Sequence, residues 1–511
     1  MPRPAIVFIG FMGAGKSTAL AAARHAGLET TEIDDLMERE LGMPIARAFE
    51  EIGEAGFRER EAEVVGSLLE NADGGAIALG GGSILIERVR AALPRHKVVW
   101  LQVDPTEAWR RIANSNRPLA TSAEDVERLL AVRLPLYEQL ADAIVPMADR
   151  NVIERALPAI QALVDLPDGT RLLWASSASG EYPVFVGRGL LKCDWWPLEG
   201  DRFLIADTAT IELFDRARLE SFIGRDATIS GERTKTLDQA KTILEDMANA
   251  SLTREGHVVA LGGGVVGDLA GLCAHLYQRG VPVVQVPTTL VAQVDSAYGG
   301  KTGVDLPQGK NYAGAYHLPA AVIADSETLD SLPAEELAAG FVEVLKTGLL
   351  AGGALWERVR AIESLDPAGL DDVVFACARY KCEIVAADER DGGLRHVLNL
   401  GHTVGHAIEA ATGYGRYRHG EAVGLGLLAA LRLSDAPELR DEVETALARY
   451  GLPTALDPAV SVDAALEALQ RDKKRTAAGV GFVLLSEPGA PRPGQLVDPA
   501  RVRASVEELL P

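Results

Sequence analysis

Residues 10–18 read GFMGAGKST and directly follow the strand-like run from Ile6 to Ile9. The stretch fits the pattern G-x-x-x-x-G-K-[ST], in which glycines allow successive backbone N–H groups to curl around a phosphate. The lysine of the pattern adds a positive charge, and the hydroxyl that follows it can ligate Mg²⁺. Because a helical run comes next, the stretch predicts an α/β domain that binds ATP or GTP with Mg²⁺ through Gly13, Ala14, Gly15, Lys16, Ser17 and Thr18.

Outward from this loop, short β-branched runs alternate with helical stretches over about the first 160 residues. AIVFIG, GAIALGGG and KVVWLQV are each followed by a helical run, which is typical of a parallel α/β sheet. The rhythm breaks at a segment rich in Pro, Asp and Gly, and strand-like sequence returns in RFLIAD, HVVALGGG, VPVVQVPTT and AAVIAD. From about Leu332 the sequence is mostly Ala, Leu and Glu. We therefore predict one domain over 1–166 and a second over 170–511, with an α/β part (170–331) and a helical part (332–511).

Composition limits the classes of protein. A chain of 511 residues exceeds what one hydrophobic core normally serves. The formal net charge of −22 disfavours a general nucleic-acid or anionic-membrane surface. The four cysteines form no C-x-x-C pair, no secretory leader is evident, and no apolar run reaches the roughly 18–20 residues that a membrane span needs. We expect a cytoplasmic enzyme that binds small molecules.

The remaining motifs of the first domain, in order, are EIDDLME, EAGFRERE, LGGGS, NRPL and VRLPLY. Together with the phosphate loop they resemble shikimate kinase along essentially the whole domain. The resemblance implies that Asp34 binds the shikimate hydroxyls and activates the attacking one. Arg58 and Arg133 would clamp the substrate carboxylate, which suits the planar guanidinium fork. The triplet Gly80, Gly81 and Gly82 would let the ring approach closely.

The resemblance also implies a nucleotide side to this site. Arg110 and Arg117 would attend ATP and the transferring phosphoryl group, whose spread charge catalysis must stabilise. Lys16, Asp34 and Arg117 would then be the catalytic residues. The family usually has Asp-x-Asp after its second strand, whereas this chain reads Glu32, Ile33, Asp34. Glu32 would reach the magnesium through water.

Residues 395–421 read RHVLNLGHTVGHAIEAATGYGRYRHGE and hold four of the nine histidines. His402 and His406 are four apart, which on a helix places both imidazoles on one face. A metalloprotease motif H-E-x-x-H requires Glu where this chain has Thr403, so that reading fails. Glu343 in GFVEVLKTG could complete a His₂Glu zinc site. The residues alone do not choose which two histidines bind the metal.

Glycine and lysine motifs of the second domain point to anionic ligands. LGGGVVGD at 261–268 follows a strand-like run, but such a loop alone is weak evidence. It gains weight from VPTTL and from SAYGGKTGVDLPQGKN, where Lys301 and Lys310 flank a glycine-rich turn in a strongly acidic protein.

These motifs, with SGERTK, LNLGHTVGHA and HGEAV, resemble 3-dehydroquinate synthase from about Leu172 onward. The resemblance implies that Glu343, His402 and His419 bind Zn²⁺, or Co²⁺ in its place, while His406 lies unligated near the substrate. NAD would be bound by Asp207, Glu232, Lys235, Gly263, Gly264, Gly267, Asp268, Thr288, Thr289, Lys301, Lys310, Thr328 and Ser331. Substrate contacts would be Asp295, Lys301, Asn311, Lys346, Lys381, Arg395, Asn399 and His406, with one of Lys473 and Lys474. Lys301, His406, Lys346 and Lys381 would be catalytic.

The fold class implied is α/β: a P-loop kinase domain with a parallel sheet, then a synthase-like unit made of a Rossmann-like part and a mostly helical part. In the implied reaction NAD takes a hydride, phosphate is eliminated, the hydride returns and an aldol step closes the ring, so NAD is not consumed. Arg279 would reach the substrate phosphate of a neighbouring subunit, which implies a homodimer through the synthase part.

Three alternatives stay open for the sequence. The second domain could be another sugar-phosphate cyclase, or a metal-dependent polyol dehydrogenase, which would not need the cluster of Lys301, Lys346, Lys381 and Arg395. Either half could also be an inactive scaffold, against which the intact Lys16, Ser17, Asp34, Glu343, His402 and His419 argue.

Overall fold

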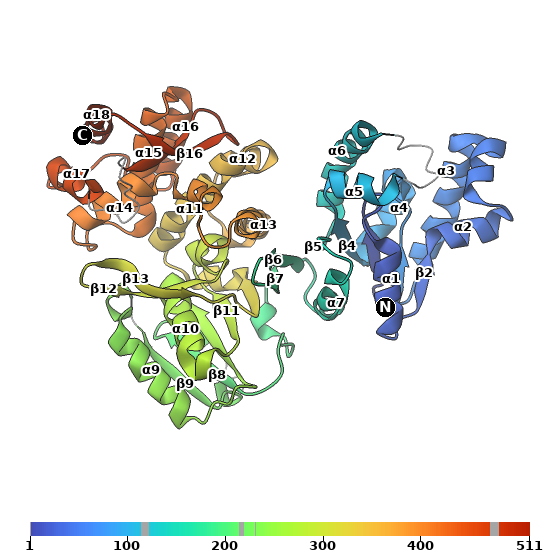
Figure 1. The fold of residues 1–511 in the computed structure, drawn as a ribbon, viewed down its shortest axis with the longest axis horizontal. Helices are drawn as coiled ribbons and strands as arrows, with labels where there is room; N and C mark the ends of the chain where they lie inside the picture. The colour runs from blue at the N-terminus through green and yellow to red at the C-terminus, as the bar shows by residue number, and fades with distance from the viewer. Residues whose placement is uncertain (1, 114–121, 214–218, 230, 471–479) are drawn as a thin grey trace. The chain divides into compact units, whose positions relative to one another are not determined.

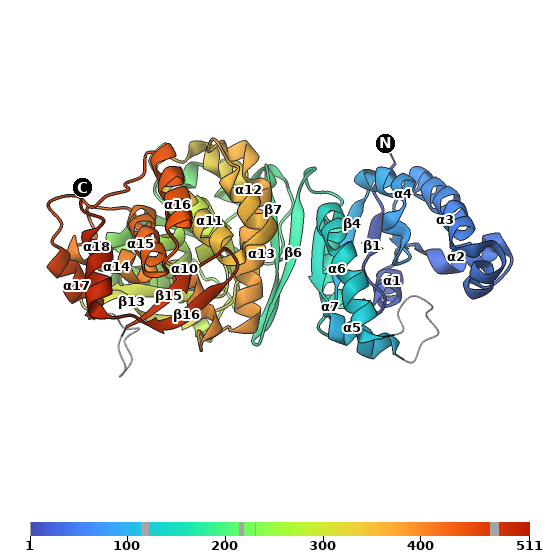
Figure 2. The same ribbon diagram turned by 90° about the horizontal axis from the view of Figure 1, so that it is seen from above.

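The structure, a computed structural model, describes residues 2–113, 122–213, 219–229, 231–470 and 480–511. The chain divides into two compact units. The first comprises the chain up to Ala175 together with residues 183–197, and the second comprises residues 176–182 and 198–511. Figures 1 and 2 show the elements of both units. The predicted domain limits at residues 166 and 170 stay a prediction.

The first unit contains a parallel sheet in the order β2-β3-β1-β4-β5. Its strands are β1 (Ile6–Ile9), β2 (Thr30–Glu32), β3 (Ala76–Ala78), β4 (Lys97–Gln102) and β5 (Ala143–Pro146). Every residue of β1 and β3 is buried, as expected for apolar strands covered on both faces. The predicted strands AIVFIG, GAIALGGG and KVVWLQV are confirmed. Two further strands, β6 (Arg171–Ser177) and β7 (Gly180–Gly187), contribute residues to both units.

Helices connect the strands of the first unit. They are α1 (Lys16–His25), α2 (Ile33–Leu41), α3 (Ile45–Asn71), α4 (Glu87–Ala92), α5 (Pro105–Ile112), α6 (Ala123–Leu140) and α7 (Val152–Ala162). Local sequence explains where two of them begin. The Asp104 side chain accepts hydrogen bonds from the first backbone N–H groups of α5, and Ser122 does the same for α6.

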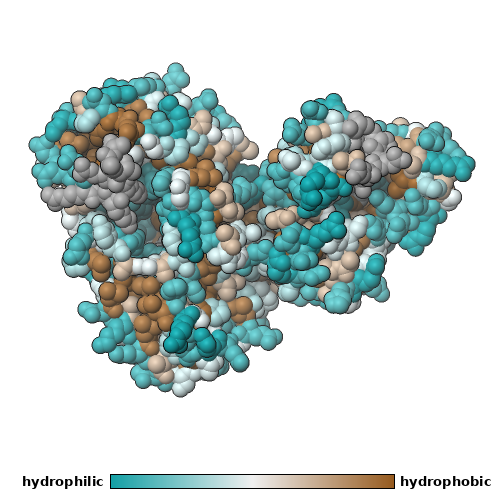
Figure 3. Space-filling view, viewed as in Figure 1, coloured by the Kyte–Doolittle hydropathy of each residue, from teal (hydrophilic) through white to brown (hydrophobic). Residues whose placement is uncertain are grey.

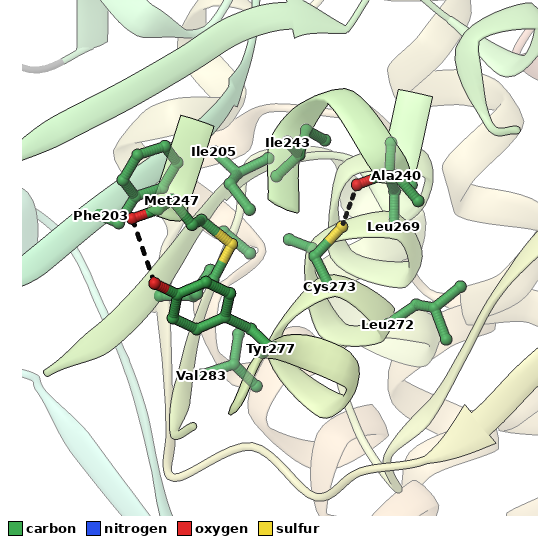
Figure 4. Packing of buried hydrophobic residues seen from close by; sticks show 14 of the residues in the cluster. Phe203, Ile205, Ala240, Ile243, Met247, Leu269, Leu272, Cys273, Tyr277 and Val283 are labelled. Carbon is green, nitrogen blue, oxygen red and sulfur yellow. Dashed lines mark hydrogen bonds between the residues drawn. The ribbon is translucent and has the colours of Figure 1, made fainter. Parts of the chain in front are cut away.

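The α/β part of the second unit is a parallel sheet in the order β14-β11-β10-β8-β9. Its strands are β8 (Arg202–Asp207), β9 (Gly224–Ile229), β10 (His257–Gly262), β11 (Val283–Pro287) and β14 (Ala321–Asp325), so all four predicted strands are confirmed. Helices α9 (Leu237–Asn249) and α10 (Gly264–Leu276) lie side by side over it (Figure 1). Figure 4 shows the core between them, where the Tyr277 hydroxyl donates to the Met247 carbonyl at 3.3 Å.

The α/β part also contains a hairpin, which precedes β14, and helices dominate after β14. The hairpin joins β12 (Lys301–Leu306) to β13 (Gly309–Tyr316). The helices are α11 (Ala334–Ala351), α12 (Gly353–Arg360), α13 (Asp371–Ala387), α14 (His402–Ala411), α15 (His419–Leu433), α16 (Pro437–Arg449), α17 (Val462–Gln470) and α18 (Pro499–Glu507). A second hairpin pairs β15 (Gly481–Leu485) with β16 (Pro491–Leu496). The expected helical last third is confirmed.

The surface agrees with the charged composition. On the face shown in Figure 3, hydrophilic side chains alternate with smaller apolar areas. Among the described helices, none combines the length and the apolar character that a membrane crossing requires.

Candidate active sites

The loop between β1 and α1 has the backbone that a phosphate cradle needs. Gly13 and Gly15 have φ of 77° and 95°, in the left-handed region that favours glycine. The helix begins at Lys16, so its unpaired N–H groups face the loop. The Lys16 ammonium donates to the carbonyls of Gly10 at 2.9 Å and Phe11 at 3.2 Å, which holds the positive charge over the loop.

The structure places Glu32 beside the predicted magnesium ligand. Glu32 is the last residue of β2, and its Oε1 accepts a hydrogen bond from the Ser17 hydroxyl at 2.5 Å. A carboxylate and a hydroxyl in contact are hard oxygen donors of the kind that Mg²⁺ prefers. The Glu32 side chain therefore reaches the predicted magnesium ligand from the end of β2.

The predicted shikimate contacts converge around the glycine triplet Gly80–Gly82, which follows β3. Arg133 is buried and donates to the carbonyl of the middle glycine at 3.0 Å. A Cβ on the last glycine would lie 2.5 Å from Nη2 of Arg58, and one on the first would lie 3.5 Å from Oδ1 of Asp34. The triplet lacks side chains where two guanidinium groups and a carboxylate meet. Side chains from α2, α3 and α6 thus form one polar cluster around the glycine triplet.

Sequence reasoning missed Glu61, which holds this polar cluster together. Its side chain is only 3% exposed. One carboxylate oxygen accepts from Arg58 at 2.5 Å and the other from the Ser83 hydroxyl at 2.5 Å. The spacing of three residues between Arg58 and Glu61 in one helix was an available signal. Glu61 limits the rotation of the Arg58 guanidinium.

The two neighbouring arginines of α5 differ in surroundings. Arg110, the predicted nucleotide contact, has a side chain that is 74% exposed and pairs with Glu107. Arg111 has a side chain that is 13% exposed and donates to the carbonyls of Gly13 at 3.0 Å and Met147 at 3.2 Å. The structure therefore brings Arg111 to the phosphate loop. Arg117, Lys473 and Lys474 lie outside the described residues.

In the second unit, three imidazoles and one buried carboxylate form a cluster. The ring centroids of His402, His406 and His419 are 5.2, 5.3 and 5.8 Å apart. Oε1 of Glu343, from α11, lies 3.4 Å from Nε2 of His402 and 3.3 Å from Nε2 of His419. Glu343 is fully buried, and no hydrogen bond from the described residues satisfies Oε1. An unsatisfied buried oxygen facing two imidazole nitrogens offers the types of donor atom that a His₂Glu zinc site uses.

The electrostatics of the cluster favour a cation. Burial alone would lower the pKa of His419, but the carboxylates of Glu343 and Glu409 raise it to about 10. A proton or a metal ion can supply this positive charge. His406 belongs to the same group of potential ligand atoms, all within 4.8 Å of one another.

Close helix packing brings the histidines together. His402 opens α14 and His419 opens α15, and the two helices cross at glycines. A Cβ on Gly426 would lie 2.0 Å from the carbonyl oxygen of Gly401. Only the absence of a side chain allows the backbones to approach so closely.

A buried chain of alternating charges leads away from the cluster. The Lys346 ammonium lies 2.5 Å from Oε2 of Glu343 and 4.0 Å from Asp295, and Asp295 also accepts from Lys381. Burial alone would lower the pKa of Lys346, but Glu343 and Asp295 raise it. Burial lowers the pKa of Lys381 even though Asp295 opposes this. The predicted substrate residues Asp295, Lys346 and Lys381 are therefore in contact with the predicted metal residues.

The other predicted substrate residues differ in how the structure holds them. Arg395 is buried and donates to the Glu389 carbonyl at 2.6 Å. Lys301 is half-exposed and pairs at 2.5 Å with Asp391, a carboxylate that sequence reasoning missed. Asn311 is exposed, and Asn399 ends the helical turn before α14. Arg279 is exposed on the turn after α10, so its role toward a neighbouring subunit stays a prediction.

The predicted NAD contacts gather at the carboxyl ends of the parallel strands. Asp207 ends β8, the glycines from Gly263 follow β10, and Thr288 follows β11. Ligands of open α/β sheets bind at this edge. Other predicted NAD-binding residues contact one another in pairs. Lys235 donates to Asp268 at 2.6 Å, Lys310 lies 3.9 Å from Glu232, and the Ser331 hydroxyl donates to the Thr328 carbonyl at 3.0 Å.

Gly267 shows why one of these positions has no side chain. A Cβ there would lie 2.8 Å from Oε1 of Gln285 on the neighbouring strand β11. The glycine lets α10 begin close against the sheet, where its first N–H groups meet the strand ends.

Comparisons with known proteins relate both parts of the chain to enzyme families. Family models match shikimate kinase at residues 12–163, 3-dehydroquinate synthase N-terminal at 227–339 and 3-dehydroquinate synthase C-terminal at 340–475. The 3-dehydroquinate synthase of Symbiobacterium thermophilum is 43% identical over 350 residues, which cover 64% of this chain and 98% of the relative. That of Halorhodospira halophila is 41% identical and covers 62% and 94%.

Solved structures with a similar fold cover the second unit. A 2-deoxy-scyllo-inosose synthase complexed with carbaglucose-6-phosphate, NAD⁺ and Co²⁺ superposes with a TM-score of 0.59 at 24% identity, over 67% of this chain and 100% of that one. A 2-epi-5-epi-valiolone synthase from Streptomyces hygroscopicus, with NAD⁺ and Zn²⁺ bound, gives 0.56 at 24%, over 66% and 99%. At this identity the likeness shows the fold. The chain belongs to the 3-dehydroquinate synthase family and carries a shikimate kinase domain ahead of the synthase, which makes it an enzyme of the shikimate pathway with both activities.

Proposed function

We propose that residues 1–166 transfer a phosphoryl group from ATP to the 3-hydroxyl of shikimate. The observation that carries this is the polar cluster of Asp34, Arg58, Arg133 and Gly80–Gly82 next to the phosphate loop. Two guanidinium groups suit a carboxylate, and Asp34 is the nearby base for a hydroxyl. Lys16 neutralises phosphate charge, while Ser17 and Glu32 supply oxygens to Mg²⁺.

Asp34→Asn in the full-length chain tests this kinase proposal. Loss of the carboxylate base should lower ATP-dependent phosphorylation of shikimate by about 10²–10⁴-fold. ADP release with and without shikimate is the measurement, and the synthase rate of the same preparation is the control. Unchanged phosphorylation would refute the role of Asp34.

We propose that residues 170–511 convert 3-deoxy-D-arabino-heptulosonate 7-phosphate into 3-dehydroquinate and phosphate. The observation that carries this is the convergence of Glu343, His402 and His419 with the buried lysines. Glu343, His402 and His419 would hold the metal ion, which would polarise a substrate hydroxyl. The strand ends would hold NAD, which would accept and return a hydride.

The chain's own groups handle the charge of the substrate. Lys346, Lys381 and Arg395 provide buried positive charge for phosphate and carboxylate, and Asp295 keeps two of these cations in place. Burial lowers the pKa of Lys381, which makes its ammonium a better proton donor than an exposed lysine. We further propose a cytoplasmic homodimer, in which Arg279 completes the neighbouring site.

Two matched histidine variants test the synthase proposal. His402→Ala should lose both the bound metal and synthase activity, because a three-ligand site cannot spare a ligand. His406→Ala should keep the metal and lose rate by about 10²–10⁴-fold. Metal analysis decides the assignment, and equal metal loss in both variants would show that the pair four apart binds the ion.

Product analysis separates the alternatives. The wild-type protein with heptulosonate phosphate and NAD should release phosphate and 3-dehydroquinate without net NADH. Net NADH would indicate a polyol dehydrogenase, and turnover only with another sugar phosphate would indicate a different cyclase.

A further inference from the structure

Glu409, to which the sequence assigned no role, lies against one of the histidines of the metal cluster. It is on α14, three residues after His406, and is only 3% exposed. Its Oε2 lies 3.4 Å from Nδ1 of His419, while Nε2 of the same ring lies 3.3 Å from Glu343. The imidazole is therefore held between two carboxylates, one at each ring nitrogen.

The two ring nitrogens have different tasks when a histidine binds a metal. The ligating nitrogen must present a lone pair, so the proton must be on the other one. A carboxylate beside that second nitrogen accepts its N–H, selects the tautomer, orients the ring and makes the ligating nitrogen more basic. Glu409 is placed to do this for His419.

Glu409 also contacts the α/β part of the same unit. Its Oε1 accepts a hydrogen bond from Lys310 at 3.3 Å, and Lys310 lies on β13, 99 residues away in sequence. Lys310 is in turn 3.9 Å from Glu232 and 4.7 Å above the Tyr414 ring. A continuous series of contacts thus runs from Glu343 through His419, Glu409 and Lys310 to Glu232.

We propose that Glu409 is a positioning residue that orients His419 for the cation held with Glu343 and His402, and that its contact with Lys310 joins this site to the predicted NAD-binding segment. The inference rests on the proposed metal site. The plain alternative is that Glu409 serves only as the counterion of Lys310.

Metal affinity of the full-length protein separates these readings. Zinc binding is measured by competition with a chromogenic chelator without NAD, and the Co²⁺ absorption spectrum reports ligand geometry. Glu409→Gln is nearly isosteric and should weaken zinc binding about 10–100-fold and alter the cobalt spectrum. Lys310→Met should change zinc affinity much less, because it leaves the Glu409–His419 contact in place.

Glu421→Gln is the matched control. This neighbouring carboxylate caps α15 through Arg418 and contacts no imidazole of the cluster in the described structure. It should leave zinc affinity unchanged within about twofold, with thermal unfolding confirming that all variants fold.

The outcomes distinguish two kinds of failure. If wild-type protein binds zinc no better than His402→Ala, the proposed metal site is wrong. If wild-type protein binds zinc and Glu409→Gln binds it equally well with an unchanged cobalt spectrum, only the role of Glu409 is refuted. Equal zinc loss in Glu409→Gln and Lys310→Met would also overturn it, because the Lys310 ion pair would then be what matters.

Discussion

Gly426→Ala should disturb the metal cluster without touching any of its ligands. The substituted Cβ would lie 2.0 Å from the Gly401 carbonyl oxygen and 2.8 Å from the Gly405 nitrogen, whereas real Cβ atoms essentially never come closer than 3.0 Å. Both obstacles are backbone atoms of, or next to, α14, so no side chain can rotate away. Helices α14 and α15 must separate by about 1 Å to accommodate the methyl group.

This separation has a predictable cost. Overpacking a close-packed interior costs about 1–3 kcal/mol, and the rigid backbone contact places this variant near the upper end. Each kcal/mol of lost stability lowers Tm by about 2–4 °C in a domain of 150–250 residues, and by less in a larger one. A loss near ~3 kcal/mol should therefore lower Tm by about 6 °C or somewhat less in this larger unit. Because His402 is on one helix and His419 on the other, zinc affinity should weaken. A misplacement of about 1 Å should lower the synthase rate about a hundredfold.

Gly424→Ala provides the comparison within the same helix. Its Cβ would meet Cδ2 of Leu447 at 3.1 Å, which is the mobile end of a side chain. Thermal unfolding, chelator competition for zinc and synthase rate are measured on both variants. Equal Tm and equal zinc affinity in the two would refute the view that the α14–α15 contact sets the geometry of the cluster.

Three further predictions concern other parts of the chain. Lys16→Ala should lower kinase activity by about 10²-fold or more and leave the synthase rate unchanged, because the effects of mutations in separate cores are additive. Parallel loss in both assays would show that the two activities are coupled. Native protein should react with iodoacetamide at one thiol, that of Cys193, because burial raises the pKa of the others to about 12; mass spectrometry after labelling should find no adduct on Cys273, Cys377 or Cys382. Burial lowers the pKa of His257 from the ordinary 6.5 to about 4. Between these two pH values the unfolded chain binds more protons than the native one, so the free energy of unfolding should fall on acidification from about pH 6.5 to 4. Urea unfolding across this range should show a smaller loss in His257→Gln, and identical pH dependence of the two proteins would contradict the assignment.

Local sequence patterns predicted most of the elements. Glycine, lysine and hydroxyl residues at fixed spacing define the phosphate loop, because neighbouring backbone groups alone build it. Apolar runs predicted β1, β3, β4 and the sheet of the second unit, since a strand buried on both faces needs continuous apolar sequence. The family motifs supplied the residue types of both sites, and the structure places Asp34, Arg58 and Arg133 around the glycine triplet.

The sequence by itself determined which chemical groups this protein carries and which short segments present them: a phosphate loop, several arginines, a histidine-rich segment and two lysines that flank a glycine-rich turn. Only the tertiary structure decided which of these groups are partners. That Arg111 rather than Arg110 reaches the phosphate loop depends on how α5 packs against it. That Glu409 meets both His419 and Lys310 depends on the crossing of α14 and α15 and on a hairpin 99 residues away. Short-range patterns encode the backbone because neighbouring residues build it, whereas contacts between distant side chains follow from how whole elements pack.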